Sequence, residues 1–83
     1  MSYKDFLSLS FYDQLRALYV EGTFVVAIRY YKHKVNLYLM KGYYIEVFYN
    51  HKEDKIDKIG LYDSSSNRSK FYADQVKLPE GLL

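Results

Sequence analysis

The chain has 83 residues, enough for one domain, and it is rich in core-forming side chains, with 49% hydrophobic residues, 19% aromatic residues and 11 tyrosines. It contains no cysteine, which excludes disulfide staples, thiol catalysis and cysteine-ligated zinc or iron–sulfur centres, and favours a reducing compartment. A formal net charge of +2 is too small to indicate nucleic-acid binding by itself.

The first predicted elements are helical. Ser10 stands at an N-cap position, and Asp13 falls in the first turn, where the helix dipole favours a carboxylate. Gly22 follows at the position where a helix often ends in a left-handed residue. We therefore expect a helix over about 11–21, preceded by a short helical turn that begins at residue 3. The apolar stripe of the main helix is formed by Phe11, Leu15, Leu18 and Tyr19.

After this helix, β-branched and aromatic residues predict strands over about 23–31, 35–40, 43–49 and 55–62. In the first strand, alternation places four side chains on one face: Phe24, Val26, Ile28 and Tyr30. Glycine accepts the positive φ of a tight turn, so Gly42 predicts a two-residue hairpin loop that pairs Tyr38 with Ile45. In the fourth strand the apolar residues break strict alternation, and Gly60 predicts a bulge or bend there.

A serine-rich loop leads to a short predicted helix over about 67–76, whose Phe71 and Val76 are expected to reach the core. Pro79 and Gly81 indicate an irregular tail. The expected fold is α+β, with an N-terminal helix and its preceding turn, a four-stranded antiparallel meander and a short C-terminal helix. We expect one domain over residues 1–83, with helical 3–21, sheet 23–62, a helix at 67–76 and a tail at 77–83.

No group of residues indicates catalysis. The two histidines, His33 and His51, both fall in predicted turns beside lysines, and no motif marks a nucleophile. The four glycines are scattered singly, which argues against a phosphate-binding loop. No spacing of histidine and carboxylate residues matches a metal site. We therefore expect a non-catalytic protein without a cofactor or metal.

The N-terminal residues hold no apolar run long enough for a signal peptide. No segment approaches the roughly 20 apolar residues of a membrane-spanning helix. Together with the absence of cysteine, this predicts a cytoplasmic protein that does not bind a membrane.

Both faces of the hairpin formed by the second and third strands are apolar, whereas a small antiparallel sheet normally leaves one face polar and wet. Exposed apolar patches often mark interaction sites. We therefore expect a protein-interaction module that binds a protein partner, or itself as a homodimer, through a sheet face or edge. The candidate partner-binding residues are Leu37, Leu39, Tyr44 and Phe48.

The alternative is weak binding of single-stranded nucleic acid through the basic, tyrosine-rich strands at 29–41. Aromatic side chains that stack on bases, next to cations that hold phosphates, are the minimum requirement for such binding. The same side chains also fit a tyrosine-rich strand with ordinary lysines at its edge. The candidate residues for this alternative are Arg29, Tyr31, Lys32 and Lys34.

Three segments resemble a group of short bacterial hypothetical proteins. They are Gly22-Thr23-Phe24, Val35-Asn36-Leu37-Tyr38 and Gly42-Tyr43-Tyr44-Ile45-Glu46-Val47-Phe48-Tyr49-Asn50. In that group, members often carry tryptophan at the position of Phe48 and aspartate at that of Lys41. The resemblance implies a bacterial cytoplasmic protein with a shared fold, and it implies no reaction and no functional residues.

Overall fold

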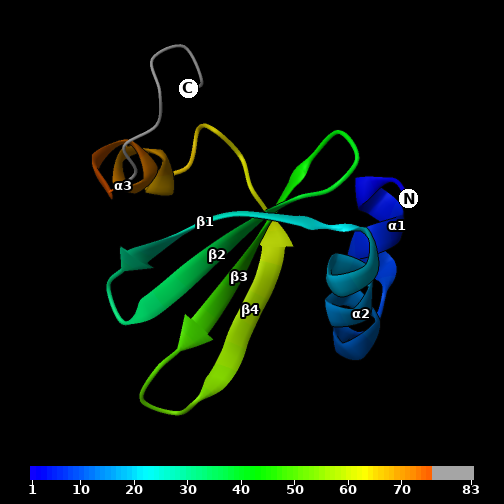
Figure 1. The fold of residues 1–83 in the computed structure, drawn as a ribbon, viewed down its shortest axis with the longest axis horizontal. Coiled ribbons are helices and arrows are strands. Elements are labelled where there is room, and N and C mark those ends of the chain that lie inside the picture. The colour runs from blue at the N-terminus through cyan, green and yellow to red at the C-terminus, as the bar shows by residue number, and fades with distance from the viewer. Residues whose placement is uncertain (76–83) are drawn as a thin grey trace.

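A computed structural model describes residues 1–75 of the chain (Figure 1). It contains α1 (Tyr3–Ser8), α2 (Phe11–Glu21), β1 (Thr23–Tyr30), β2 (His33–Leu39), β3 (Tyr44–Asn50), β4 (Lys55–Leu61) and α3 (Arg68–Gln75). The four strands form one antiparallel sheet in the order β1-β2-β3-β4, so the predicted α+β fold is confirmed. The expected core residue Val76 and the predicted tail at 77–83 lie outside the described residues.

Serine caps begin both N-terminal helices. The Ser2 hydroxyl accepts a hydrogen bond from the Asp5 amide at 3.1 Å, and the Ser10 hydroxyl accepts one from the Asp13 amide at 3.2 Å. The bounds of α2 agree with the predicted helix at 11–21.

The expected left-handed end of α2 at Gly22 is wrong. Gly22 is extended, with φ −84° and ψ 154°, and leads straight into β1. A Cβ atom at this position would lie 2.7 Å from the Leu18 carbonyl oxygen and 3.2 Å from the Met40 sulfur. Glycine is needed here because the backbone passes close to its neighbours.

The β2–β3 hairpin has the predicted register. Tyr38 pairs with Ile45, and the Met40 amide donates to the Tyr43 carbonyl at 2.8 Å across the two-residue loop. Gly42 in that loop has φ +90°, a conformation that side chains other than glycine rarely adopt.

A bulge in β1 changes the face on which one aromatic side chain lies. The register shifts between Phe24 and Val26, so Val25 is an extra residue. Phe24 therefore pairs with Tyr38 and packs edge-on against its ring, with ring centroids 5.7 Å apart. The prediction that Phe24 and Val26 share one face is wrong, because the extra residue reverses the alternation.

A second bulge lies in β4, as the broken alternation there predicted, but its position differs. Phe48 pairs with Lys58 and Tyr49 pairs with Ile56, which leaves Asp57 as the extra residue. This bulge allows Ile56 to share a face with the rest of the core despite its odd spacing. Gly60 is paired regularly with Glu46, so the expectation of a bulge or bend at Gly60 itself is wrong.

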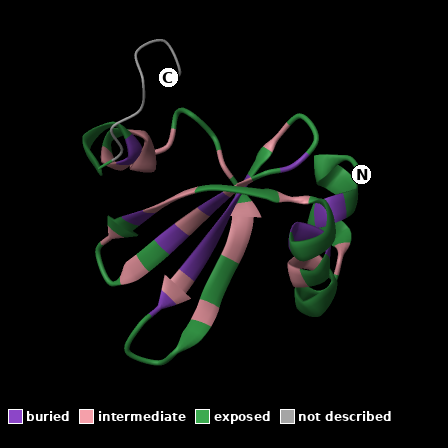
Figure 2. Cartoon of the chain, in the orientation of Figure 1, coloured by how far each residue is buried: buried purple, intermediate pink, exposed green. Residues whose placement is uncertain are grey.

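The sheet has two apolar faces, which we name by the helix that packs on each. Figure 2 shows the buried positions gathered in the central strands. The buried cluster on the α2 face consists of Phe6, Ala17, Leu18, Met40, Ile45 and Val47. The buried cluster on the α3 face consists of Ile28, Val35, Leu37, Phe48 and Tyr72. Among residues 1–75 no helix is long and apolar enough to cross a membrane.

Candidate binding surfaces

The α3 face holds two of the four residues expected to bind a partner. Leu37 and Phe48 are only 7% and 6% exposed, because α3 packs over them through Tyr72. The premise that the hairpin leaves this surface open is therefore wrong for these two residues. The short C-terminal helix covers more apolar surface than its length suggests.

A buried polar network holds α3 on the sheet. Glu46 is 1% exposed, and the Nε of Arg68 donates to both of its carboxylate oxygens, at 2.9 and 2.7 Å. The Tyr72 hydroxyl donates to the same carboxylate at 2.9 Å. Burial and the adjacent carboxylate raise the pKa of Tyr72 far above its usual value, and the hydrogen bond to Glu46 raises the pKa of Arg68. The Glu46 carboxylate is thus paired with both Arg68 and Tyr72, and this network anchors α3 to the sheet.

Leu39 and Tyr44, the other two expected partner-binding residues, lie together at the rim of the α3 face. They are paired across β2 and β3, and they are 37% and 40% exposed. Tyr44 packs edge-on against Tyr62, with ring centroids 6.4 Å apart. The structure thus separates the predicted set into a buried pair and a half-exposed pair.

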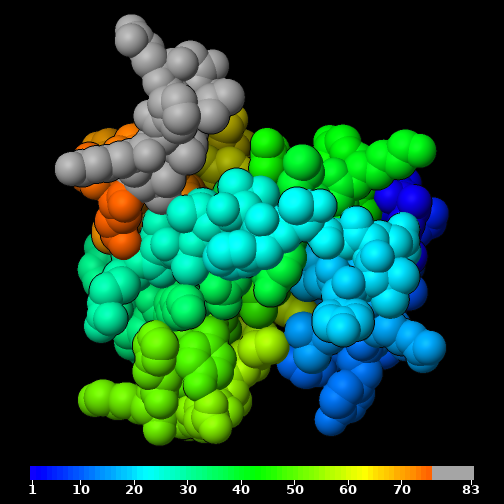
Figure 3. Space-filling view, in the orientation of Figure 1, coloured from blue at the N-terminus to red at the C-terminus, as the bar shows by residue number. Residues whose placement is uncertain are grey.

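The α2 face is covered less completely than the α3 face, and a groove separates α2 from the sheet. It encloses about 380 Å³, and Figure 3 shows the surface hollowed between α2 and the strands β3 and β4. We call this feature the α2 groove. Its lining is formed by Leu15, Leu18, Tyr19, Gly22, Phe24, Asn36, Tyr38, Val47, Tyr49 and Ile56.

One wall of the α2 groove comes from the apolar stripe predicted for this helix. Tyr19 is 91% exposed and Phe11 is 44% exposed, while Leu15 is half-buried at the groove. The buried residues of α2 are Leu18, a member of that stripe, and Ala17, which lies outside it. The predicted stripe is therefore wrong for Phe11 and Tyr19, because α2 lies beside the sheet and contacts it along a narrow side.

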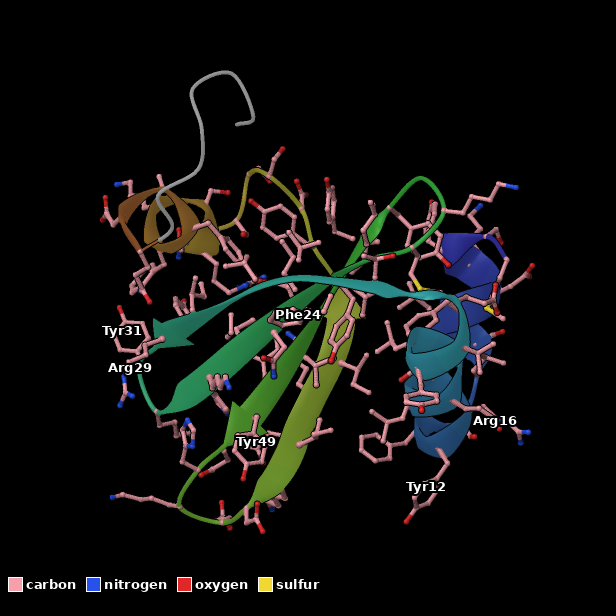
Figure 4. All side chains as sticks on the ribbon, in the orientation of Figure 1. Tyr12, Arg16, Phe24, Arg29, Tyr31 and Tyr49 are labelled. Atoms are coloured by element: carbon pink, nitrogen blue, oxygen red, sulfur yellow. The ribbon has the colours of Figure 1, made fainter. Side chains whose placement is uncertain are left out.

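The opposite wall comes from the sheet and is aromatic. Phe24 is 54% exposed at the mouth of the groove, and Tyr38 and Tyr49 line it from the two central strands. In Figure 4, Phe24 lies near the middle of the sheet, and Tyr12 and Arg16 project from the outer side of α2. The groove thus has two facing apolar walls.

The α2 groove contains no charged side chain. Its polar groups are the Asn36 amide and the tyrosine hydroxyls, of which that of Tyr49 donates to Asp54 in the following turn. Within residues 1–75 no hydrogen bond joins the Asn36 side chain to another group of the protein. Such a surface accepts apolar side chains together with a neutral hydrogen-bonding partner, such as a peptide group.

The basic residues of the nucleic-acid alternative divide between two places. Arg29 and Lys34 are paired across β1 and β2 and share the α2 face, whereas Lys32 is exposed in the turn between these strands. Tyr31 is 80% exposed in that turn, has φ 56°, and packs edge-on against Tyr30 with centroids 4.8 Å apart. Figure 4 shows Arg29 and Tyr31 at the end of the sheet far from α2.

His33 was expected in a solvated turn, but it begins β2 and makes a specific contact. Its Nε2 donates to the Asp57 carboxylate at 2.8 Å, and the Asn50 side chain donates to the same oxygen at 3.2 Å. The hydrogen bond from His33 lowers the pKa of Asp57. These contacts tie the start of β2 to β4 and to the end of β3.

The edges of the sheet are blocked against further strand pairing. The Gln75 side chain accepts from the Arg29 amide at 2.6 Å and donates to the Arg29 carbonyl at 2.7 Å, which occupies the backbone of β1. The extra residue Val25 interrupts the rest of this edge, and β4 carries its own bulge and two lysines. These are the devices by which sheet proteins avoid edge-to-edge association, so pairing through an edge is disfavoured.

Comparison with known proteins adds no assignment, since no family model, no curated protein and no solved structure matches the chain. Within residues 1–75, histidine and carboxylate side chains form no group of three that could hold a metal ion.

The α2 groove was not predicted from the sequence. Its walls depend on the bulge at Val25, which moves Phe24 to the α2 face, and on the lateral position of α2. One signal was available: α2 carries Tyr12, Tyr19 and Val20 in addition to its buried residues, more apolar side chains than one narrow contact side can bury.

Proposed function

We propose that this chain is a small non-catalytic protein-interaction module of the cytoplasm, and that its α2 groove receives bulky apolar side chains of a partner polypeptide. One observation carries the proposal: two apolar walls face each other across an open groove that contains no charge. The partner is a different protein in this proposal. A second copy of the chain is an outcome of the test described below.

The size of the groove supports a side-chain anchor. Its volume of about 380 Å³ lies near the small end of the range of roughly 300–1,000 Å³ that is usual for ligand sites. Protein interfaces are commonly centred on a few aromatic or aliphatic side chains that fill such pockets. Tyr19 and Phe24 stand at the mouth with most of their ring surface accessible, so they can close over an inserted side chain.

The energetics support a binding role as well. Tyr19 and Phe24, which line the groove, are 91% and 54% exposed, and a buried aromatic side chain removes about 150–250 Å² from water. The two rings therefore offer on the order of 300 Å² of surface at the groove, at the lower end of the range for the largest patch on a typical monomer. At about 25 cal/mol per Å², covering this surface contributes about 7 kcal/mol before the costs of association.

The proposal is tested by selecting short peptides from a displayed random library on the immobilised full chain. We expect the recovered peptides to share one or two bulky apolar residues. Phe24→Asp places a charge at the mouth of the groove and should abolish their binding. Tyr12→Asp is the matched control, because Tyr12 is also an exposed aromatic residue but lies outside the groove lining, and it should leave binding within about twofold.

Circular dichroism of both variants establishes that they are folded. Recovery of no common motif, or equal binding by wild type and Phe24→Asp, would contradict the proposal. Sedimentation velocity on the same proteins covers the remaining case. A dimer that dissociates in Phe24→Asp and persists in Tyr12→Asp would assign the groove to a second copy in place of a different partner.

A further inference from the structure

A shallow depression on the α2 face lies near the α2 groove and differs from it in charge. It encloses about 320 Å³ and is lined by Ala27, Ile28, Arg29, Lys34, His51 and Gln75. We call it the cationic depression. Its charged members come from β1 and β2, and no carboxylate contributes to its lining.

Arg29 and Lys34 are directly opposite each other across β1 and β2. Their Cβ atoms are therefore separated by roughly 4.5–5.5 Å, an arrangement in which like charges destabilise a sheet. Neither side chain belongs to an ion pair with any residue of the part described, 1–75. Gln75 binds only the backbone of Arg29, so the guanidinium group is not engaged by it.

On the α3 face at the same end of the sheet, charged side chains do contact acidic partners. There His33 contacts Asp57 at 2.8 Å, and Lys55 lies 3.6 Å from Glu53 and 3.9 Å from Asp57. Acidic residues at this end of the sheet thus contact His33 and Lys55. The Arg29–Lys34 pair lies on the face that carries the open groove, and no carboxylate within residues 1–75 pairs with it.

The cationic depression is within reach of the groove. Tyr49, the cross-strand partner of Lys34, lines the α2 groove, and so does Asn36, which is two residues further along β2. At about 3.4 Å per residue, Asn36 lies about 7 Å from Lys34. A polypeptide segment with its apolar anchor in the groove can therefore reach Lys34 within about two to four residues.

We infer that Arg29 and Lys34 bind a carboxylate side chain of the partner, so that the segment recognised by this chain is acidic as well as apolar. The inference rests on the proposed function, because the same partner fills the groove. Arginine suits the role because its planar fork matches a carboxylate with two parallel hydrogen bonds. Lys34 adds a second, flexible donor.

A nucleic acid fits the same surface less well. Its backbone carries a phosphate at every nucleotide, and proteins that bind single strands follow it with a continuous series of cations. The α2 groove has no cation along its lining, so such a series would stop at Lys34. Tyr31, the candidate stacking residue, lies in the turn and packs against Tyr30 and Phe71, with ring centroids 4.8 and 5.9 Å away.

The test repeats the peptide selection on wild type and on the double variant Arg29→Gln/Lys34→Gln. The control is Lys4→Gln/Lys41→Gln, which removes the same charge from exposed positions outside both lining sets. We expect wild type and control to select apolar residues with aspartate or glutamate two to four positions away. The double variant should select the apolar residues without the acidic preference.

Fluorescence anisotropy with a labelled wild-type-selected peptide measures the size of the effect. The double variant should bind about tenfold more weakly at low salt, and high salt should remove the difference. Apolar peptides without acidic residues on wild type, or the same acidic preference on the double variant, would overturn this inference alone. Failure to recover any peptide would overturn the proposed function with it.

Binding of a labelled oligothymidylate tests the nucleic-acid alternative. Binding that is competed by the selected peptide and lost in Arg29→Gln/Lys34→Gln would overturn the carboxylate assignment in favour of a nucleic acid. We expect no such competition.

Discussion

The buried Glu46–Arg68–Tyr72 network offers the strongest test of how α3 is held in place. We consider the substitution Arg68→Met, which keeps most of the side-chain volume but leaves the Glu46 carboxylate, 1% exposed, with only the Tyr72 hydroxyl as its partner. Breaking a buried ion pair costs roughly 3–5 kcal/mol. The Arg68 side chain is 19% exposed, so solvent partly screens the pair, and we expect the lower value of about 3 kcal/mol.

This loss is large for a chain of 83 residues, whose total stability is expected at about 4–12 kcal/mol. Urea unfolding followed by far-ultraviolet circular dichroism measures it. With a slope near 1 kcal/mol per molar urea, the midpoint should fall by about 3 M. If wild type lies at the lower end of this range, Arg68→Met unfolds at little or no urea, a result that supports the same reasoning.

A compensating variant separates the buried charge from lost packing. In Glu46→Leu/Arg68→Met/Tyr72→Phe all three polar groups are replaced together, so none is left without a partner. Replacing a buried ion pair by apolar side chains of similar volume is often neutral or stabilising, and the triple variant should recover to within about 1 kcal/mol of wild type. A cost below about 1 kcal/mol for Arg68→Met, or a triple variant as unstable as the single one, would contradict the role assigned to the buried ion pair.

Three further outcomes are expected. Gly22→Ala should destabilise the fold by about 1–3 kcal/mol in urea unfolding, because its Cβ would lie 2.7 Å from a backbone oxygen. The control Gly60→Ala, whose Cβ meets only a lysine carbon at 3.6 Å, should cost less than about 0.5 kcal/mol, and equal costs for the two variants would contradict the prediction. The pKa of Asp57 is lowered mainly by the hydrogen bond from His33, so the ionised Asp57 stabilises the folded state. This contribution to folding stability is present above the ordinary aspartate pKa of about 3.9 and is lost as the pH falls through the lowered pKa of the folded state. In His33→Ala, carbon-detected nuclear magnetic resonance should show that pKa moved upward, and an unchanged value would exclude the contact in solution. Gln75→Ala should speed hydrogen exchange at the β1 amide that Gln75 accepts from, without changing exchange in the central strands, and unaltered exchange would mean that the edge is not clamped.

Much of the fold followed from local chemistry. The serine cap and the acidic first turn of α2 are encoded within a few residues, and the helix begins where those signals predict. The glycine at position 42 predicts a two-residue loop, and the pairing of Tyr38 with Ile45 follows by counting outward from it. Such features depend on neighbours along the chain, so the sequence alone suffices for them.

The bulges mark the limit of that reasoning. Alternation predicts faces correctly only while the register is unbroken, and one extra residue reverses every side chain beyond it. The extra residue in β1 sends Phe24 to the α2 face, and the one in β4 brings Asp57 to the contact with His33. Neither position carries a glycine, so the usual signal for a bulge is absent from both.

Local sequence signals were enough to predict the class of the fold, the strand order implied by short connections, and the register of the central hairpin, because each arises from contacts between near neighbours. The tertiary structure alone decided which apolar surface is covered. It placed α3 over Leu37 and Phe48 through a buried ion pair spanning 22 residues, and it left the groove beside α2 open. Whether a helix packs over a sheet face or beside it depends on side chains distant in the chain, so the position of the helix cannot be predicted from local periodicity.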